Sequence, residues 1–215
     1  MAFGKKEVVE ITPPKFRTAV FKLIGMSPLV IHRFSQKAKT DIENRAKAGD
    51  LAKAKKKKEA ADFDQAYLDA FHVSTDGWYG FPASAFRNAM IEACKIVNYV
   101  MTRAKLAVFV EADGIDEVEG IGLVRIEGKP EKMSMAVRNQ NSISGGSSIC
   151  VRPMWRKWEM TLHVRYDEDM MTLTDITNLL ARAGAQVGVG EGRPASRKSC
   201  GMGWGTFRIQ EEKTK

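Results

Sequence analysis

The chain has few cysteines and no long apolar run, and these two shortages exclude several classes of protein. Its three cysteines, Cys94, Cys150 and Cys200, lie far apart and form no CxxC pair. This count excludes a disulfide scaffold and a cysteine-rich zinc site, and it fits a reducing cytoplasm. No stretch approaches the roughly 18 apolar residues of a membrane-spanning helix, and the first residues lack the apolar core of a secretory signal. We therefore expect a cytoplasmic protein that contacts no membrane.

Histidine and the familiar catalytic motifs are scarce as well. The three histidines, His32, His72 and His163, show no HxH or HxxxH spacing, which disfavours a histidine metal site. The chain has no GxSxG elbow, so the sequence gives no sign of that hydrolase type. We expect no metal and no cofactor, and His32 is the one weak candidate for a catalytic role.

Positive charge is plentiful and unevenly placed. The 215 residues hold 34 Lys and Arg against 26 Asp and Glu, a formal net charge of +8. Basic residues are concentrated in the ranges 37–59, 138–157 and 182–208, whereas 111–131 is acidic. Such blocks are either ordinary solvated faces or a surface that binds a polyanion, because Lys and Arg supply most nonspecific affinity for nucleic acid.

The pattern of apolar residues predicts an α+β protein. After insertions are set aside, the expected order is strand, helix, strand, strand, helix, strand, which is the βαββαβ plan of ferredoxin-like and RNA-recognition (RRM-like) folds. We expect the second helix to be capped by Thr174 and to end at Gly184. The segments are strands at 16–24, 106–110, 122–126, 159–166 and 206–209, two helices within 34–72, a helix from Ser84 whose apolar face runs from Phe86 to Val97, and a helix from 174 to 184.

We expect one folded domain with two insertions. Residues 1–14 form an arm, 15–210 the domain, and 211–215 a tail. A basic helical insertion at 34–75 follows the first strand, and a β-hairpin and loop insertion occupies 130–158.

A glycine-rich loop at 184–205 is the most distinctive motif. It reads GAQVGVGEGRPASRKSCGMGWG, with seven glycines in 22 positions and Arg193, Arg197 and Lys198 between them. Glycine allows positive φ and close approach of the backbone to a ligand, and successive N–H groups can then face an anion. The loop follows a helix, so it is neither a dinucleotide fingerprint, which follows a strand, nor a Walker A loop, which needs GK[ST]. It predicts contact with phosphate, or else a purely structural connection.

Three features of the chain resemble the RAMP superfamily, the repeat-associated proteins of CRISPR effector complexes. The first is the glycine-rich loop before the last strand, and the second is the opening strand with the sequel MSPLV at 26–30, similar to a "PLHIG"-like turn. The third is YGFPASAFRNAM at 79–90, similar to the "IPGSSLKGALR" turn that opens the first core helix of backbone subunits. Ala83 and Asn88 replace two glycines of that turn, and the matching places are held by Pro82, Ser84, Phe86 and Arg87.

The resemblance implies a core that binds RNA and often polymerises along a guide strand. We therefore expect a non-enzymatic, sequence-tolerant subunit that binds single-stranded nucleic acid, RNA rather than DNA. It would self-associate along the strand, and other effector-complex subunits are further expected partners. Two alternatives stay open: an endoribonuclease of the same superfamily that uses His32 as general acid or base, and a phage or assembly protein that binds a protein partner or single-stranded DNA.

The candidate nucleic-acid contacts follow from these motifs. Arg193 and Arg197 are the first candidates to bind phosphate, with Lys198 next. The structural alternatives are a solvated lysine face, a capping role for Ser84, and core positions for Trp155, Trp158 and Trp204, which otherwise suit base stacking. The remaining candidates are Gly190, Gly192, Gly201, Gly203, Ser84, Arg87, Lys55, Lys56, Lys57, Lys58, Arg152 and Arg156.

Overall fold

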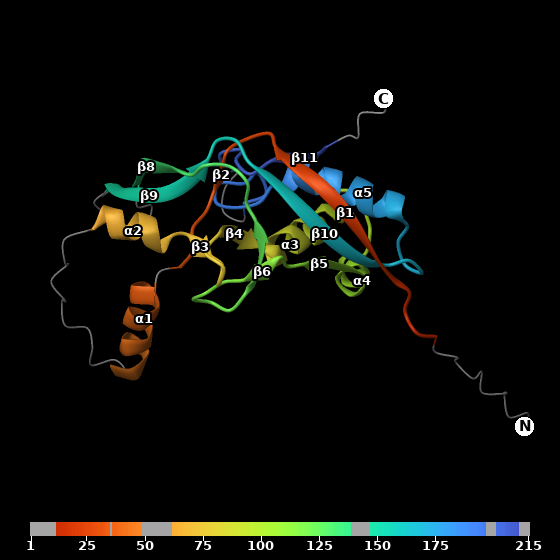
Figure 1. Ribbon diagram of the computed structural model, residues 1–215, viewed down its shortest axis with the longest axis horizontal. Helices are drawn as coiled ribbons and strands as arrows, with labels where there is room; N and C mark the ends of the chain where they lie inside the picture. The colour runs from red at the N-terminus through yellow and green to blue at the C-terminus, as the bar shows by residue number, and fades with distance from the viewer. Residues whose placement is uncertain (1–11, 35, 49–61, 139–146, 197–200, 211–215) are drawn as a thin grey trace, which may run out of the picture.

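The computed structural model describes residues 12–34, 36–48, 62–138, 147–196 and 201–210. Within them the chain forms antiparallel sheets and α-helices (Figure 1). The α+β class predicted from the sequence is therefore confirmed. None of the helices in this described part is long and apolar enough to cross a membrane.

The main sheet has four strands in the order β11-β1-β10-β5, and every neighbouring pair is antiparallel. The long central strands are β1 (Phe16–Gly25) and β10 (Glu159–Asp167). The edges are β5 (Val108–Glu111) and β11 (Phe207–Ile209). The apolar and polar residues of β10 alternate in the sequence, and its even-numbered residues Met160, Leu162, Val164 and Tyr166 are the buried ones.

Two helices cover one face of this sheet. They are α3 (Ala83–Ala93) and α5 (Leu173–Arg182), whose apolar side chains join the inward residues of β1 and β10 in one core. Figure 1 shows the helices behind β1 and β10, with the opposite face of the sheet uncovered. Val20 on that opposite face is 61% exposed. The sheet and its two helices therefore form a two-layer structure, and the other face of the sheet is open.

The ends of α5 differ from the prediction. The N-cap is Thr172, not Thr174: its side chain accepts a hydrogen bond from the N–H of Asp175, whose carboxylate accepts one from Thr172 in return. The helix does not end at Gly184 but continues as a π-helical turn, η2 (Ala183–Val187), up to Gly188 at φ 71°. Gly184 is needed for packing instead, since a Cβ there would lie 2.3 Å from the carbonyl oxygen of Phe207.

The region between α3 and the main sheet also corrects the sequence analysis. The core face of α3 does not extend to Val97, which lies beyond the helix and is 43% exposed. The strand expected at 106–110 begins at Val108, because residues Met101–Ala107 form a short helix, α4. Ser84 does not cap α3: the N-cap position is Pro82, and no side-chain hydrogen bond caps this helix.

A second sheet has the order β2-β9-β8. The hairpin of β8 (Glu131–Arg138) and β9 (Ser147–Trp155) lies within the predicted hairpin insertion, and its turn is outside the described residues. The two-residue strand β2 (Leu29–Val30) joins it by pairing with Met154 and Trp155. Trp155 and Trp158 are buried, which supports the core interpretation over the base-stacking one for both residues.

A third sheet has the order β3-β4-β7-β6. Its strands are β3 (His72–Val73), β4 (Tyr79–Pro82), β7 (Gly122–Arg125) and β6 (Gly114–Ile115). Only β7 was expected, at 122–126. The two-residue strands β3 and β6 are too short to show an apolar alternation, and β4 contains Gly80 and Pro82, which are typical of turns.

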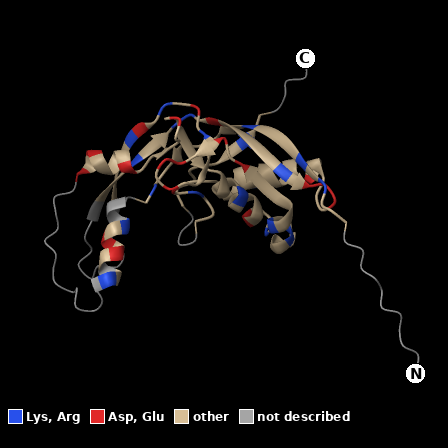
Figure 2. Cartoon of the chain, turned by 60° about the horizontal axis from the view of Figure 1, so that its bottom comes forward, with Lys and Arg blue, Asp and Glu red and all other residues tan. Residues whose placement is uncertain are grey.

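The helical insertion contributes α1 (Gln36–Ala48) and α2 (Phe63–Asp69). Figures 1 and 2 show α1 standing away from the sheets, and the colours of Figure 2 show basic and acidic residues interleaved along it. The ammonium of Lys39 lies 2.6 Å from a carboxylate oxygen of Glu119, on the turn between β6 and β7. The lysine run Lys55–Lys58 lies outside the described residues.

The turn between β6 and β7, which contacts α1 through Glu119, is stabilised by the buried pair of His72 and Asp116. His72 Nδ1 lies 2.8 Å from Asp116 Oδ2, and both residues are buried. Burial alone would raise the pKa of Asp116, but the N–H of Glu119, the His72 ring and the N–H of Val118 outweigh it and lower that pKa. The carboxylate is therefore stabilised in its charged form.

Candidate functional site

The glycine-rich loop is pinned between β2 and β11 by backbone hydrogen bonds. The N–H of Val189 donates to the carbonyl of Gly205 (2.9 Å), and the N–H of Gly205 donates to the carbonyl of Pro28 (2.7 Å). The N–H of Glu191 donates to the carbonyl of Val30 (2.9 Å). The loop therefore takes its position from the short segment that follows β1, far away in the sequence.

The glycines of the loop are explained largely by its own folding. At Gly190 (φ +82°) a Cβ would lie 2.6 Å from the carbonyl oxygen of Val30, and at Gly201 (φ +65°) it would lie 2.0 Å from that of Arg193. Gly192 (φ +74°) packs on the indole of Trp204 in the same way. Gly203 (φ +73°) has open space around it, so only its backbone conformation calls for glycine.

Several backbone N–H groups that could have bound an anion donate hydrogen bonds to carbonyl groups of the loop itself. The N–H groups of Met202 and Trp204 both donate to the carbonyl of Gly192, at 2.7 and 3.2 Å, and that of Ala195 donates to Val187. At these positions the loop does not form the anion cradle that the glycine spacing suggested. Its side chains, Arg193 first, are what it can offer to a ligand.

A three-residue polar cluster joins the loop to the second sheet. Arg152 on β9 donates through Nε to Glu191 Oε2 (2.9 Å) and through Nη1 to the carbonyl of Val151. Its Nη2 lies 3.3 Å from Nδ1 of His32, which in turn lies 3.6 Å from the same Glu191 oxygen. The predicted residues Arg152 and His32 are thus brought together, with Glu191 as the group that joins them.

The cluster leaves His32 uncharged near neutral pH. Burial lowers its pKa and the Arg152 guanidinium lowers it further, while Glu191 opposes both only in part. Burial also raises the pKa of the neighbouring Cys150 thiol, so this cysteine stays protonated and poorly nucleophilic. The site therefore holds one neutral imidazole and one paired guanidinium.

Arg193 differs from Arg152 in its pairing. It is half-buried on the pinned loop, and no ion pair or side-chain hydrogen bond in the described part of the chain involves it. Arg156, by contrast, is paired with Glu131 at 2.7 Å. Arg197 and Lys198 lie outside the described residues.

Arg87 and Ser84 lie on α3, where the contacts of Arg87 are structural. Its guanidinium donates to the carbonyl of Val108 (2.8 Å) and to that of Lys105, and it lies 4.7 Å from the centre of the Phe109 ring. These bonds join α3 to the end of α4 and the start of β5. Ser84 is exposed in the first turn of α3.

Sequence reasoning overlooked two groups of residues. Glu191 is the single acid of the loop, and nothing in the sequence points to its contacts with Arg152 and His32. The second group lies on the open face of the main sheet, where the Arg165 guanidinium is 4.8 Å from the Phe16 ring and 4.9 Å from the Phe109 ring. The alternation of β10 placed Arg165 outward, but it could not identify these partners.

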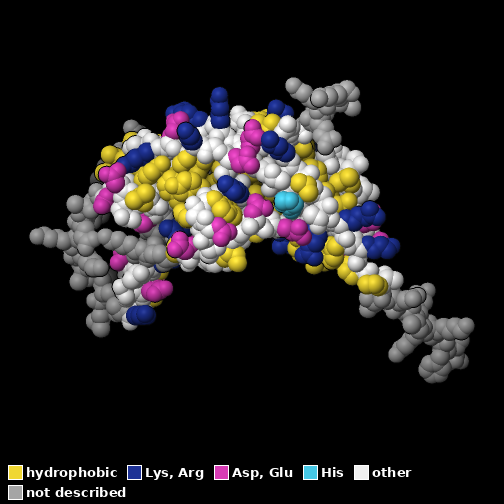
Figure 3. Space-filling model, in the orientation of Figure 1, with side chains coloured by type: hydrophobic (Ala, Val, Ile, Leu, Met, Phe, Trp, Pro, Cys, Tyr) yellow, Lys and Arg dark blue, Asp and Glu magenta, His cyan; other side chains and the backbone are white. Residues whose placement is uncertain are grey.

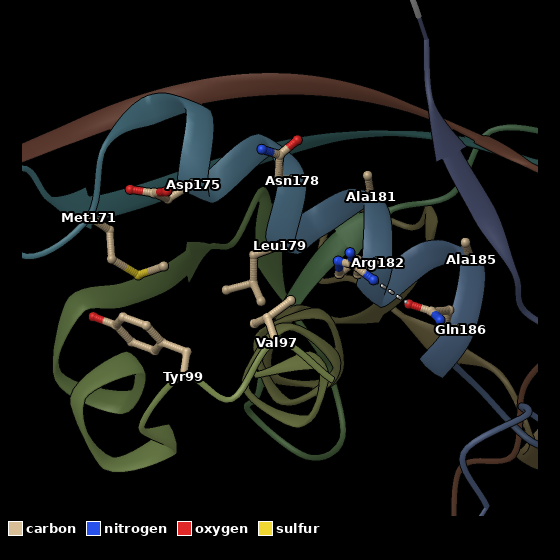
Figure 4. Close-up of a pocket in the computed structure, with 10 residues that line it drawn as sticks. All are labelled: Val97, Tyr99, Met171, Asp175, Asn178, Leu179, Ala181, Arg182, Ala185 and Gln186. Atoms are coloured by element: carbon tan, nitrogen blue, oxygen red, sulfur yellow. Dashed lines mark hydrogen bonds between the residues drawn. The ribbon is translucent and has the colours of Figure 1, made fainter. Parts of the chain in front are cut away.

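A pocket of about 790 Å³ lies on the helical side, between α5, η2 and the segment that contains Val97 and Tyr99 (Figure 4). Arg182 donates to Gln186 across its rim (3.3 Å), and Asp175 is occupied by the cap of α5. No cluster of three or more potential metal ligands was found among the described residues. The pocket therefore has no converging set of polar groups that would define a ligand.

Comparison with known proteins adds no relative. Neither the protein-family models nor the curated proteins contain a match to this chain. The resemblance to the RAMP superfamily therefore rests on the motifs described above.

Proposed function

We propose that this chain binds single-stranded nucleic acid, RNA in preference to DNA, through the glycine-rich loop and the adjoining β9, without reading the base sequence. The observation that carries the proposal is the half-buried Arg193, which has no counter-charge among the described residues. A partly desolvated cation without a partner is stabilised by an anionic ligand. Phosphate of a nucleic-acid backbone supplies that anion without regard to sequence.

The neighbouring Arg152 supports the same surface. Its side chain is 16% exposed and is neutralised by Glu191, the one acid of the loop. Glu191 lies two residues before Arg193 in the loop, so a phosphate bound by Arg193 would contact the same loop segment that carries this ion pair. Replacement of the Glu191 carboxylate by phosphate would keep Arg152 paired, so the cluster is suited to exchange one anion for another.

We infer further that the main sheet with α3 and α5 is a ferredoxin-like βαββαβ core. Support comes from the strand order β11-β1-β10-β5, the antiparallel pairing throughout, and the positions of α3 between β1 and β5 and of α5 between β10 and β11 in the chain. The glycine-rich loop then precedes the last strand of that core. On this basis we propose that several copies bind along one strand and contact each other there.

The experiment compares Arg193→Ala with Arg103→Ala, which removes an exposed arginine of α4. Binding of labelled homopolymeric RNA and DNA is followed by fluorescence anisotropy over a range of salt concentrations. We expect Arg193→Ala to lose about tenfold in affinity and to flatten the salt dependence by about one phosphate contact. The Arg103→Ala variant should bind as wild type does.

The outcomes separate the site from the function. Equal affinity and equal salt slope for Arg193→Ala and wild type would reject this site. Failure of the wild type to bind any single strand would reject the function and favour a protein partner. An Arg197→Ala/Lys198→Ala variant, measured in the same series, tests the remaining basic residues of the loop.

The endoribonuclease alternative is favoured by the polar cluster around His32, whose Nδ1 lies 3.3 Å from Arg152 Nη2 and 3.6 Å from Glu191 Oε2. Burial and the Arg152 guanidinium lower the pKa of His32, so the imidazole is able to accept a proton at neutral pH. The other two histidines lie elsewhere, His72 with Asp116 and His163 with Asp113. Cleavage of labelled RNA by wild type and its loss in a folded His32→Ala variant would establish this activity. Equal cleavage by both proteins would exclude His32 from it.

A further inference from the structure

A ladder of four aromatic rings lies where α2, β4 and β9 meet, on the opposite face of β9 from Arg152. Phe71 stacks on Tyr79 with ring centres 4.5 Å apart, and Tyr67 meets Phe71 edge to face at 5.0 Å. Trp155 lies edge to face with Phe71 at 5.8 Å and with Tyr79 at 6.1 Å. Phe71 and Trp155 are buried, so they fix the rings of the two tyrosines in place.

The two tyrosines form the surface of this ladder. Tyr79 is 40% exposed, although its ring is held by two buried aromatic neighbours. Burial and then the nearby Tyr79 phenol raise the pKa of Tyr67, while Lys132 opposes them. The Tyr67 phenol therefore stays uncharged at neutral pH and close to that of Tyr79. An exposed aromatic ring that needs no rearrangement loses little conformational entropy on binding.

Positive charge borders the rings. The ammonium of Lys132 lies 5.8 Å from the centre of the Tyr67 ring. Gly128 (φ +124°) packs against the carbonyl of Lys157 and the edge of Trp155, which brings the segments of Lys129 and Lys157 together beside the ladder. Both lysines are exposed, and no ion pair in the described ranges includes them. Figure 3 shows hydrophobic side chains gathered in the region of α2 and β9, with Lys and Arg at the border.

Most of the acidic side chains near the four aromatic rings form ion pairs. Asp64 is paired with Lys132, and Glu131 is paired with Arg156 at 2.7 Å. Glu127 forms a backbone bridge with Glu159 and has no ion pair within the described residues. Lys129 and Lys157 are therefore available to an anionic ligand that places a flat group on the rings.

We propose that Tyr79 and Tyr67 form a stacking site for unpaired bases, with Lys129 and Lys157 next to the phosphates of the same strand. This inference rests on the proposed function and extends it to a second contact, since the rings and Arg152 lie on opposite faces of the β2-β9-β8 sheet. Fixed aromatic rings interleaved with lysines match single strands, whose bases stack on such rings whatever their sequence. A strand that reaches both sites passes around the β8–β9 hairpin.

The test compares Tyr79→Leu, which keeps apolar volume without a π face, with Tyr79→Phe, which keeps the ring. The matched control is Leu68→Ala, which removes an exposed apolar side chain of the neighbouring helix α2. The anisotropy assay with homopolymeric RNA is used throughout. We expect Tyr79→Leu to lose about tenfold in affinity, and Tyr79→Phe and Leu68→Ala to bind within a factor of about two of wild type.

Ultraviolet cross-linking of the wild-type protein to the same RNA adds a readout that needs no variant. Cross-links at Tyr67 or Tyr79 support the stacking site, and cross-links confined to other residues overturn it. If wild type binds RNA in an Arg193-dependent way but Tyr79→Leu binds equally well, the stacking site is wrong and the proposed function stands. If wild type binds no single-stranded nucleic acid, the stacking site and the proposed function are both wrong. The exposed aromatic rings would then be explained by a protein partner that binds at Tyr79.

Discussion

Replacement of Gly205 by alanine should destabilise the protein far more than replacement of Gly203, although both glycines have nearly the same backbone conformation, φ +69° and +73°. For either position the left-handed conformation costs an alanine about 1–2 kcal/mol. Gly203 has nothing within 4 Å of an added Cβ, so this cost is the whole effect there. The pair therefore separates backbone strain from close packing within one loop.

At Gly205 the packing adds a second and larger effect. The added Cβ would lie 1.7 Å from the carbonyl oxygen of Val189, where about 3.5 Å is the normal separation. The backbone must move apart, which strains the hydrogen bonds from Val189 to Gly205 (2.9 Å) and from Gly205 to Pro28 (2.7 Å). At about 1 kcal/mol for each bond, the total loss reaches about 3–4 kcal/mol.

Urea unfolding followed by tryptophan fluorescence measures the two variants against wild type. A loss of about 1 kcal/mol corresponds to about 2–4 °C in melting temperature for a domain of this size, so thermal unfolding gives an independent check. Equal losses for Gly203→Ala and Gly205→Ala, or a smaller loss for the latter, would refute the close docking of the loop between β2 and β11.

Three further predictions concern single side chains and one concerns pH. Glu191→Gln should raise the affinity for single strands, because the carboxylate no longer competes with phosphate for Arg152; unchanged or lower affinity in the anisotropy assay would show that Arg152 does not meet phosphate. Arg87→Ala should lower stability by about 1–3 kcal/mol in urea unfolding and Arg87→Lys should not restore it, since a lysine cannot reach both carbonyls of α4 and β5; a stable Arg87→Ala variant with weakened binding would instead favour the phosphate role. Thr172→Ala should cost about 1 kcal/mol through loss of the capping box, whereas Thr174→Ala should cost little, and the reverse order would contradict the assigned N-cap. The pKa of His32 in the folded protein lies below its ordinary value of 6.5, so the unfolded chain binds a proton more readily than the folded chain as the pH falls. The stability that neutral His32 contributes is therefore complete above pH 6.5, and the free energy of unfolding decreases as the pH drops below that value. Asp116, whose folded-state pKa is also lowered, adds stability that is present above its ordinary value of 3.8 and is lost as the pH falls further; a urea midpoint that rises on acidification through either range would contradict these assignments.

The sequence predicted the long elements because their apolar residues are periodic. The alternation of β10 and the apolar face of α5 at Ile176, Leu179 and Leu180 both gave the correct buried side. The two-residue strands β2, β3 and β6 carry no such periodicity, so tertiary pairing alone defines them. The error at the start of α5 has a different cause, because the Thr172-x-x-Asp175 spacing of a capping box is visible in the sequence and was overlooked. Thr174 has Thr177, and no acid, at that spacing.

The candidate site was predictable in part. The glycine spacing identified the loop, but the loop's contacts with Pro28 and Val30 depend on a segment far away in the sequence. For the same reason the sequence could not reveal the contact of Arg152 with Glu191, nor that the guanidinium of Arg87 is engaged by the carbonyls of Lys105 and Val108. Charge and glycine patterns indicate where a ligand can bind, whereas the partner of each charge is set by the fold.

The most direct test of the central claim is the nucleic-acid content of the protein purified from cells. Its absorbance ratio at 260 and 280 nm and its size are measured before and after treatment with ribonuclease, deoxyribonuclease and high salt. We predict a raised ratio and a large species that shrinks to a small one on ribonuclease treatment. A clean monomer with no bound nucleic acid, unchanged by any of the treatments, would contradict the account and leave the basic residues as ordinary solvated surface.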